Sequence, residues 1–215
     1  MSITRTYING DTSTLASFLE SSGLFASVTT ESSTVTCKDA DDNTLLTITK
    51  NSSGDTITAY ASSSVSKSAT YYTSSYNTYF IEGFACANGV ILRYGATGTT
   101  SYNACLLITK TNNNKTAIVF SSSMTTIPAA YTSFYAVAWG DTAPISAYTT
   151  AANAQNQTML VPFSTNANEG LQSYTPNAGF MISGQLYSLG YGKATIGSGT
   201  YITNGYWAIK DGAAS

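Results

Sequence analysis

The chain has 215 residues, of which 43% are hydrophobic and only 9% are charged, against roughly 25% charged residues in an ordinary soluble domain. This length suffices for a sizeable core, and the hydrophobic share with a formal net charge of −2 excludes charge-driven disorder. The nine Lys and Arg residues form no basic stripe that could neutralise a run of phosphates, so we expect no nucleic-acid partner.

The first 61 residues predict a small α+β region. Leu15, Phe18 and Leu19 form an apolar stripe between a capping Asp or Thr and Gly23, which predicts a helix near 12–22. Four runs that alternate, or nearly alternate, apolar residues with Ser or Thr predict antiparallel strands. They are Leu24–Thr29, Thr34–Lys38, Leu45–Thr49 and Thr56–Ala61. These strands supply the surface on which the helix stripe packs.

A Ser-rich stretch at 62–75 lacks a clear period and predicts a linker or crossing loop before a β domain at 76–215. Four short apolar runs form the centre of that domain, with Asn- and Gly-rich hairpin breaks between them. They are Tyr79–Ala85, Val90–Tyr94, Tyr102–Thr109 and Thr116–Ser121. These runs are too continuously apolar to be half exposed, which predicts strands covered on both faces.

The rest of the β domain is predicted to add further strands and loops. Strands are expected at Phe134–Trp139, Met159–Phe163 and Phe180–Leu189, a long surface loop at 140–158, and a closing hairpin over 193–210. About eight or nine strands at this spacing indicate a sandwich or barrel. The predicted fold class is therefore mainly β: a small N-terminal α+β unit followed by an antiparallel β-sandwich or barrel.

The composition argues against catalysis. The chain has no histidine, which removes the usual general base, the Ser-His-Asp and Cys-His systems and the commonest metal ligand. A glycosidase could still use two carboxylates, and the acids of the β domain are Glu82, Asp141, Glu169 and Asp211. Strand alternation favours the outer face for Glu82, and no partner acid lies on a neighbouring motif. We predict no catalytic residue and no enzyme.

No metal or cofactor is predicted either. The acidic stretch 39–43, DADDN, resembles the opening of a calcium loop. An EF-hand loop would need Gly in place of Thr44 and Glu in place of Lys50, so a strand-to-strand turn is favoured.

The three cysteines, Cys37, Cys86 and Cys105, show no CxxC spacing. Buried thiols at Cys86 and Cys105 are favoured over a disulfide between neighbouring strands, because a thiol in an apolar run behaves as a small hydrophobe. The first residues contain no secretory signal, and no stretch has the uninterrupted apolar length that spans a bilayer. We therefore expect synthesis in a cytoplasm and no membrane partner.

Tyrosines gather around the central β runs. Tyr together with Ser, Gly and Asn is typical of adaptable recognition surfaces, and its flat ring can stack on sugars. Tyr is also a favoured strand residue whose hydroxyl reaches a wet edge, which explains any single Tyr better. For the cluster both interpretations stay open, and a protein partner is favoured over a sugar. The candidate contact residues are Tyr71, Tyr72, Tyr76, Tyr79, Tyr94, Tyr102 and Trp207.

Four short segments carry a family resemblance. At the C-terminus they are GKATI (192–196) and YITNGYWAIKD (201–211), and near the N-terminus SGLFASV (22–28) and VTC (35–37). These segments resemble small virion proteins of tailed bacteriophages that infect gut Firmicutes. The resemblance implies a structural protein of the tail, the baseplate or the capsid surface, where it would serve as a capsid decoration, in a symmetric assembly without cofactor or catalytic residue.

A surface so poor in charge is easier to understand if other copies or other proteins cover it. We therefore expect a structural subunit of a bacteriophage virion, a homo-oligomer that also contacts other virion proteins. The alternative is a carbohydrate-binding or receptor-binding module of a phage tail, with a host-surface glycan as partner. A histidine-free glycoside hydrolase is less favoured.

Overall fold

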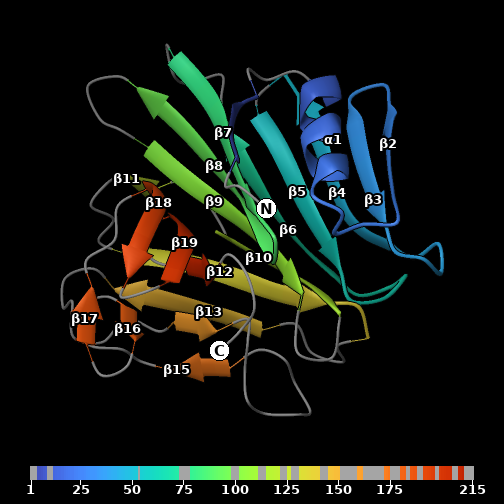
Figure 1. Ribbon diagram of the computed structural model, residues 1–215. Helices are drawn as coiled ribbons and strands as arrows, with labels where there is room; N and C mark the ends of the chain where they lie inside the picture. Colours follow the sequence, from blue (N-terminus) through green and yellow to red (C-terminus); the bar gives the residue numbers. More distant parts are fainter. Residues whose placement is uncertain are drawn as a thin grey trace.

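A computed structural model of the chain describes residues 4–8, 12–52, 54–72, 78–97, 102–110, 115–121, 125–126, 131–140, 145–150, 159–161, 172–174, 180–182, 185–187, 191–196, 199–204 and 208–210. Two large antiparallel sheets and one helix dominate this part of the chain (Figure 1). The prediction of a mainly β fold with an N-terminal α+β unit is confirmed, and the architecture is an open sandwich, not a closed barrel.

The first large sheet is a five-stranded meander. Its order is β2 (Ser27–Glu31), β3 (Thr34–Lys38), β4 (Thr44–Asn51), β5 (Gly54–Tyr60) and β6 (Ser66–Tyr72). The prediction of a linker at 62–75 is wrong for β6, which pairs with β5 along its whole length. Ala69 and Tyr71 of β6 face the core and alternate with Ser and Thr residues that face outward. This alternation is the pattern of a strand, but it is hard to recognise in a segment so rich in Ser.

The second large sheet holds the central apolar strands. Its order is β1 (Thr4–Tyr7), β7 (Thr78–Cys86), β8 (Gly89–Thr97), β9 (Tyr102–Lys110), β10 (Thr116–Ser121), β12 (Tyr131–Ala138) and β13 (Ile145–Thr150), with β11 (Thr125–Thr126) beside β9. The four central strands are confirmed. The loop predicted at 140–158 contains β13, because pairing with β12 gives this polar segment a ladder to join.

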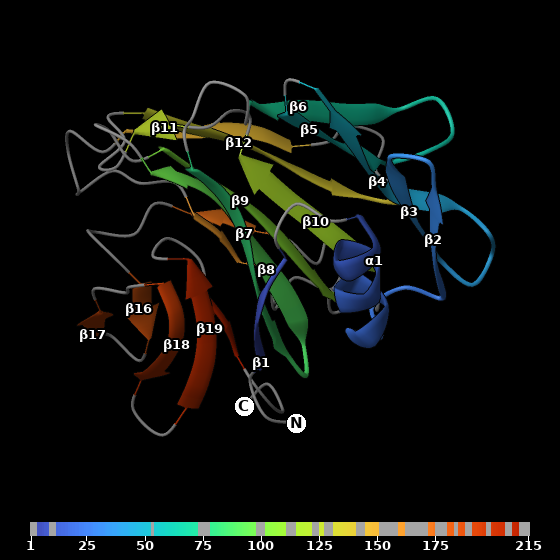
Figure 2. The ribbon, with the colours of Figure 1, turned by 90° about the horizontal axis from the view of Figure 1, so that it is seen from above.

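Helix α1 (Thr12–Ser21) packs between the two sheets and buries its predicted stripe of Leu15, Phe18 and Leu19. The Phe18 ring lies so close to Gly83 of β7 that a Cβ added there would be 2.6 Å from the ring. Glycine at this position therefore lets the helix approach the strand. Figure 2 shows α1 on the side of β7 and β8 that faces the five-stranded sheet.

A three-stranded C-terminal sheet covers the other face of β7 and β8 (Figure 2). It consists of β18 (Tyr191–Ile196), β19 (Gly199–Asn204) and β20 (Ala208–Lys210), and Ile202 of β19 is buried. Apolar side chains of the central strands are buried on both faces, as predicted: Leu92 and Leu106 face α1 and the five-stranded sheet, whereas Ile91 and Leu107 face away from them.

Two short hairpins complete the described chain. β14 (Met159–Val161) pairs with β15 (Gln172–Tyr174), and β16 (Phe180–Ile182) pairs with β17 (Gln185–Tyr187). The single strand predicted at Phe180–Leu189 is therefore wrong: this run folds back on itself, with Phe180 opposite Tyr187.

Candidate functional site

Two of the predicted contact residues belong to the core. Tyr71 of β6 and Tyr94 of β8 are fully buried, and their rings meet edge to face with centroids 5.0 Å apart. The Tyr71 hydroxyl donates a hydrogen bond of 2.7 Å to the carbonyl oxygen of Ser121. The prediction that these two tyrosines form a contact surface is wrong, because they join the two large sheets instead.

The other predicted contact residues are only partly described. Register places Tyr79, Ala96 and Tyr102 in one row across β7, β8 and β9, and Tyr72 ends β6. The side chains of these three tyrosines lie outside the description, and Tyr76 and Trp207 lie outside the described residues altogether.

Glu82, the acid of the central strands, forms a cross-strand ion pair. It lies directly opposite Arg93 of β8, and the distance from Oε2 of Glu82 to Nη1 of Arg93 is 3.5 Å. Its side chain points away from α1, as alternation predicts, but that face is also buried, and Glu82 is only 2% exposed. The pair lies on a covered face of the sheet. Asp141, Glu169 and Asp211 lie outside the described residues.

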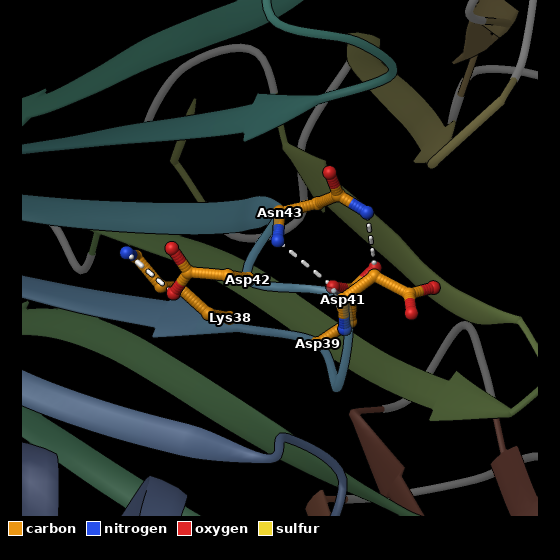
Figure 3. Close-up of polar contacts among 5 residues, drawn as sticks. All are labelled: Lys38, Asp39, Asp41, Asp42 and Asn43. Atoms are coloured by element: carbon orange, nitrogen blue, oxygen red, sulfur yellow. Dashed lines mark hydrogen bonds and ion pairs between the residues drawn. The ribbon is translucent and has the colours of Figure 1, made fainter.

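The acidic stretch 39–43 is a hydrogen-bonded turn between β3 and β4, as predicted (Figure 3). Asp39 accepts hydrogen bonds from the backbone N–H groups of Asp41 and Asn43 and from Nδ2 of Asn43, at 3.0, 2.9 and 3.0 Å. Burial raises the pKa of Asp39, but these hydrogen bonds and the charge of Lys110 outweigh it and lower the pKa below its ordinary value.

Asp42, in the same turn, has an ion-pair partner. Asp42 adopts a left-handed conformation with φ of 64° and forms an ion pair of 2.9 Å with Lys38. Asp tolerates this conformation better than most residues. Within the described part of the chain, no three His, Cys, Asp or Glu side chains group as metal ligands would.

Register argues against a disulfide between Cys86 and Cys105. Cys86 ends β7 and Cys105 lies on β9, with β8 between them. Two strand spacings and four residues of offset put their Cα atoms about 16 Å apart, whereas a disulfide joins Cα atoms within about 7 Å. Cys37 is buried in the other sheet, and desolvation raises its pKa to about 12, so it is not a reactive thiolate.

Hydroxyl groups form two rows on the face of the five-stranded sheet that points away from the core. Each strand contributes one residue to each row, and none of these residues is buried. We call them the hydroxyl rows. The first row runs Thr29, Thr36, Thr47, Thr58 and Ser68, and the second runs Glu31, Thr34, Thr49, Thr56 and Thr70. Neighbours are hydrogen-bonded within the rows: Thr34 to Thr49 at 3.0 Å, Thr56 to Thr70 at 3.1 Å and Thr58 to Ser68 at 2.9 Å.

A groove of about 470 Å³ opens at one end of this face. The β3–β4 turn, the turn after β5 and the end of β12 surround it. Its lining residues are 42–44, Thr36, Thr47, Tyr60, Ser63 and Trp139.

Trp139 is held at the groove by backbone geometry. The next residue, Gly140, has φ of 91°, a conformation that favours glycine, and its N–H donates a hydrogen bond of 2.7 Å to the carbonyl oxygen of Ala61. This bond ties the end of β12 to the turn between β5 and β6. Trp139 therefore packs partly against the core while it lines the groove.

The groove combines two half-buried aromatic side chains, Trp139 and Tyr60, with hydroxyl and amide groups. Among its described lining residues, Asp42 is the one that carries a charge, and its carboxylate pairs with Lys38. A concave site with aromatic walls and a few polar groups suits a small uncharged ligand rich in hydroxyls.

Sequence reasoning did not find this groove. It interpreted the alternating Thr residues as a strand pattern and Trp139 as the end of an apolar run. The sequence does contain a signal for the hydroxyl rows, because Thr recurs at alternate positions of successive strands. Whether these Thr residues line up across the sheet depends on the strand registers, which the turns determine.

No family model, curated protein or solved structure matches the chain. Among the described helical residues, no segment has the length and hydropathy needed to cross a membrane.

Proposed function

We propose that this chain is a carbohydrate-binding module that binds a neutral host-surface glycan and acts as part of a bacteriophage virion. The observation that carries the proposal is the groove, in which Trp139 and Tyr60 lie beside hydroxyl and amide groups. Aromatic rings stack on the C–H faces of sugar rings, and hydroxyl and amide groups exchange hydrogen bonds with sugar hydroxyls. The virion setting rests on the family resemblance of the terminal segments.

The charges at the groove support binding of neutral sugars. Asp42 is the one acid among the described lining residues, and its pairing with Lys38 leaves little net charge on them to attract an ionic ligand. A glycosidase needs two carboxyl groups across the scissile bond, and the described lining residues offer one. The arrangement therefore favours binding over hydrolysis.

A glycan array followed by titration calorimetry tests the proposal. Wild-type protein should bind neutral glycans in preference to sialylated or sulfated ones. Trp139→Ala should raise Kd about thirtyfold, which corresponds to ~2 kcal/mol. Because Trp139 also packs against the core, Tyr60→Ala serves as a second variant, and circular dichroism checks that both are folded.

Thr30→Val is the matched control, since Thr30 is exposed on the opposite side of β2 from the hydroxyl rows. It should bind like the wild type. Equal binding by the wild type and both groove variants would contradict the proposal.

A second candidate, a structural subunit that assembles through strand edges, is favoured by β2. It is the edge strand of the five-stranded sheet among the described strands, and four of its five residues are exposed. Such an edge pairs readily with a strand of another copy. Light scattering tests this candidate: an oligomer at micromolar concentration supports it, and a stable monomer argues against it.

A further inference from the structure

The hydroxyl rows continue out of the groove across the whole five-stranded sheet. Thr36 and Thr47 line the groove and are also members of the first row. From Thr47 the row passes to Thr58 of β5 and Ser68 of β6, on the next two strands. Any ligand long enough to leave the groove toward β6 therefore lies over these hydroxyls.

We propose that the ligand of this site is an extended, neutral oligosaccharide chain, with one end in the groove and the following sugar rings along the hydroxyl rows. The inference rests on the proposed function, because it names the class of glycan that the groove binds. The proposed occupant of this face of the sheet is a linear glycan and not a second copy of the chain.

The dimensions of the rows fit a chain and exceed a single sugar. Four strand spacings give each row a length of about 19 Å, and the part of the first row from Thr47 to Ser68 spans two of these spacings, about 10 Å, which is still wider than one sugar ring. The two rows are two residues apart along the strands, about 7 Å.

The chemistry of the rows also fits sugars. Each Thr presents a methyl group and a hydroxyl group, so the face is an even mixture of apolar and hydrogen-bonding surface, as a sugar ring is. A hydroxyl can donate one hydrogen bond and accept two, so the paired Thr58 and Ser68 still have capacity for a ligand. Nine of the ten row positions carry a hydroxyl, and Glu31, at the β2 end, is the one charged residue. A neutral ligand over the row positions of β3 to β6 covers no charged residue of the rows, so no ionic group there has to give up its hydration.

The test is a chain-length series. Linear neutral oligosaccharides of glucose, of N-acetylglucosamine and of mannose, from the monosaccharide to the hexasaccharide, are titrated against the full chain. For the series that binds, Kd should fall by about tenfold or more between the disaccharide and the hexasaccharide, which corresponds to at least ~1.4 kcal/mol.

The double variant Thr58→Val, Ser68→Ala removes two hydroxyls of the first row outside the groove. It should bind the disaccharide like the wild type and lose the gain with length. The double variant Thr56→Val, Thr70→Val does the same for the second row, and Thr30→Val is the control for an exposed hydroxyl on the opposite side. Thermal unfolding shows that each variant is folded.

The outcomes separate the two proposals. Binding that does not depend on length, or a length gain that survives in both double variants, would overturn the chain-binding inference and leave the groove intact. A change of solution mass in the double variants, without a change in affinity, would assign the rows to self-association and overturn it too. An absence of binding by every saccharide would remove the proposed function and this inference with it.

Discussion

The outer face of the five-stranded sheet is open and lined by Thr and Ser, whereas the corresponding face of β7 and β8 lies beneath the C-terminal sheet. Both sheets bury one face against the shared core. On the face that points away from this core, the five-stranded sheet, which we call the open sheet, carries hydroxyl pairs such as Thr58 and Ser68. The sheet that contains β7 and β8, which we call the covered sheet, carries Ile91, Leu107 and the Glu82–Arg93 pair on that face. A polar side chain is therefore a surface group in one sheet and a buried partner in the other, and its substitution has a different cost in each.

Replacement of a glutamate should show this difference most strongly. Glu82→Ala removes the carboxylate that pairs with the half-buried Arg93, and should lower the free energy of unfolding by about 3 kcal/mol. Glu31→Ala, in the exposed edge strand β2, should change it by less than about 0.5 kcal/mol. Urea unfolding measures both. Similar losses in the two variants would contradict the comparison.

Close packing of α1 on β7 predicts the next largest effect. Gly83→Ala places a methyl group against the Phe18 ring and should destabilise the protein by about 1–3 kcal/mol. In a Phe18→Leu background the same substitution should cost clearly less, because the smaller side chain leaves room. Thermal unfolding of the two single variants and the double variant gives the coupling energy, and strict additivity would argue against this contact.

Removal of a threonine hydroxyl should distinguish the sheets more finely. Thr109 of β9 is buried and donates a hydrogen bond of 2.9 Å to the carbonyl oxygen of Asn88, so Thr109→Val should cost about 1–2 kcal/mol. Thr58→Val, on the open sheet, should cost less than about 0.5 kcal/mol. Chemical unfolding of both variants decides the matter, and a larger loss for Thr58→Val would reverse the assignment of open and covered faces.

The smallest predicted effect concerns acid stability at the edge of the open sheet. The pKa of Asp39 is lower in the folded protein than in the unfolded chain, so its ionised form contributes stability above the unfolded pKa, and that contribution is lost as the pH falls through the folded pKa. Asp39→Asn should therefore be less stable than the wild type at neutral pH, and the difference should shrink in acid. Urea unfolding at a series of pH values measures it, and a constant difference would contradict the assignment.

Local patterns predicted the elements whose residues face a single consistent environment. The stripe of Leu15, Phe18 and Leu19 predicted α1, because helix period and burial agree there. The continuous apolar runs predicted strands covered on both faces, because alternation disappears when both faces are buried. These signals need no knowledge of which strand is the neighbour.

Features that depend on long-range pairing were not predictable in this way. Tyr71 and Tyr94 meet only because β6 and β8 belong to facing sheets, and nothing near either residue indicates that. Trp139 lies at the groove because the next residue, Gly140, forms a backbone hydrogen bond with Ala61, which is far away in the sequence. The predicted contact set therefore followed tyrosine composition, whereas the candidate site follows register.

The contact of Phe18 with Gly83 also has a consequence for synthesis on the ribosome. The strands β2 to β6 follow α1 directly and can pair as each hairpin emerges, since their contacts are local. The helix, however, faces β7, and β7 is also the partner of β1. The nascent chain therefore carries β1 without its strand partner, and α1 with β2 and β3 as neighbours but without β7, until β7 has left the exit tunnel. An arrested chain that ends before β7 should expose the side of the Phe18 ring that contacts Gly83.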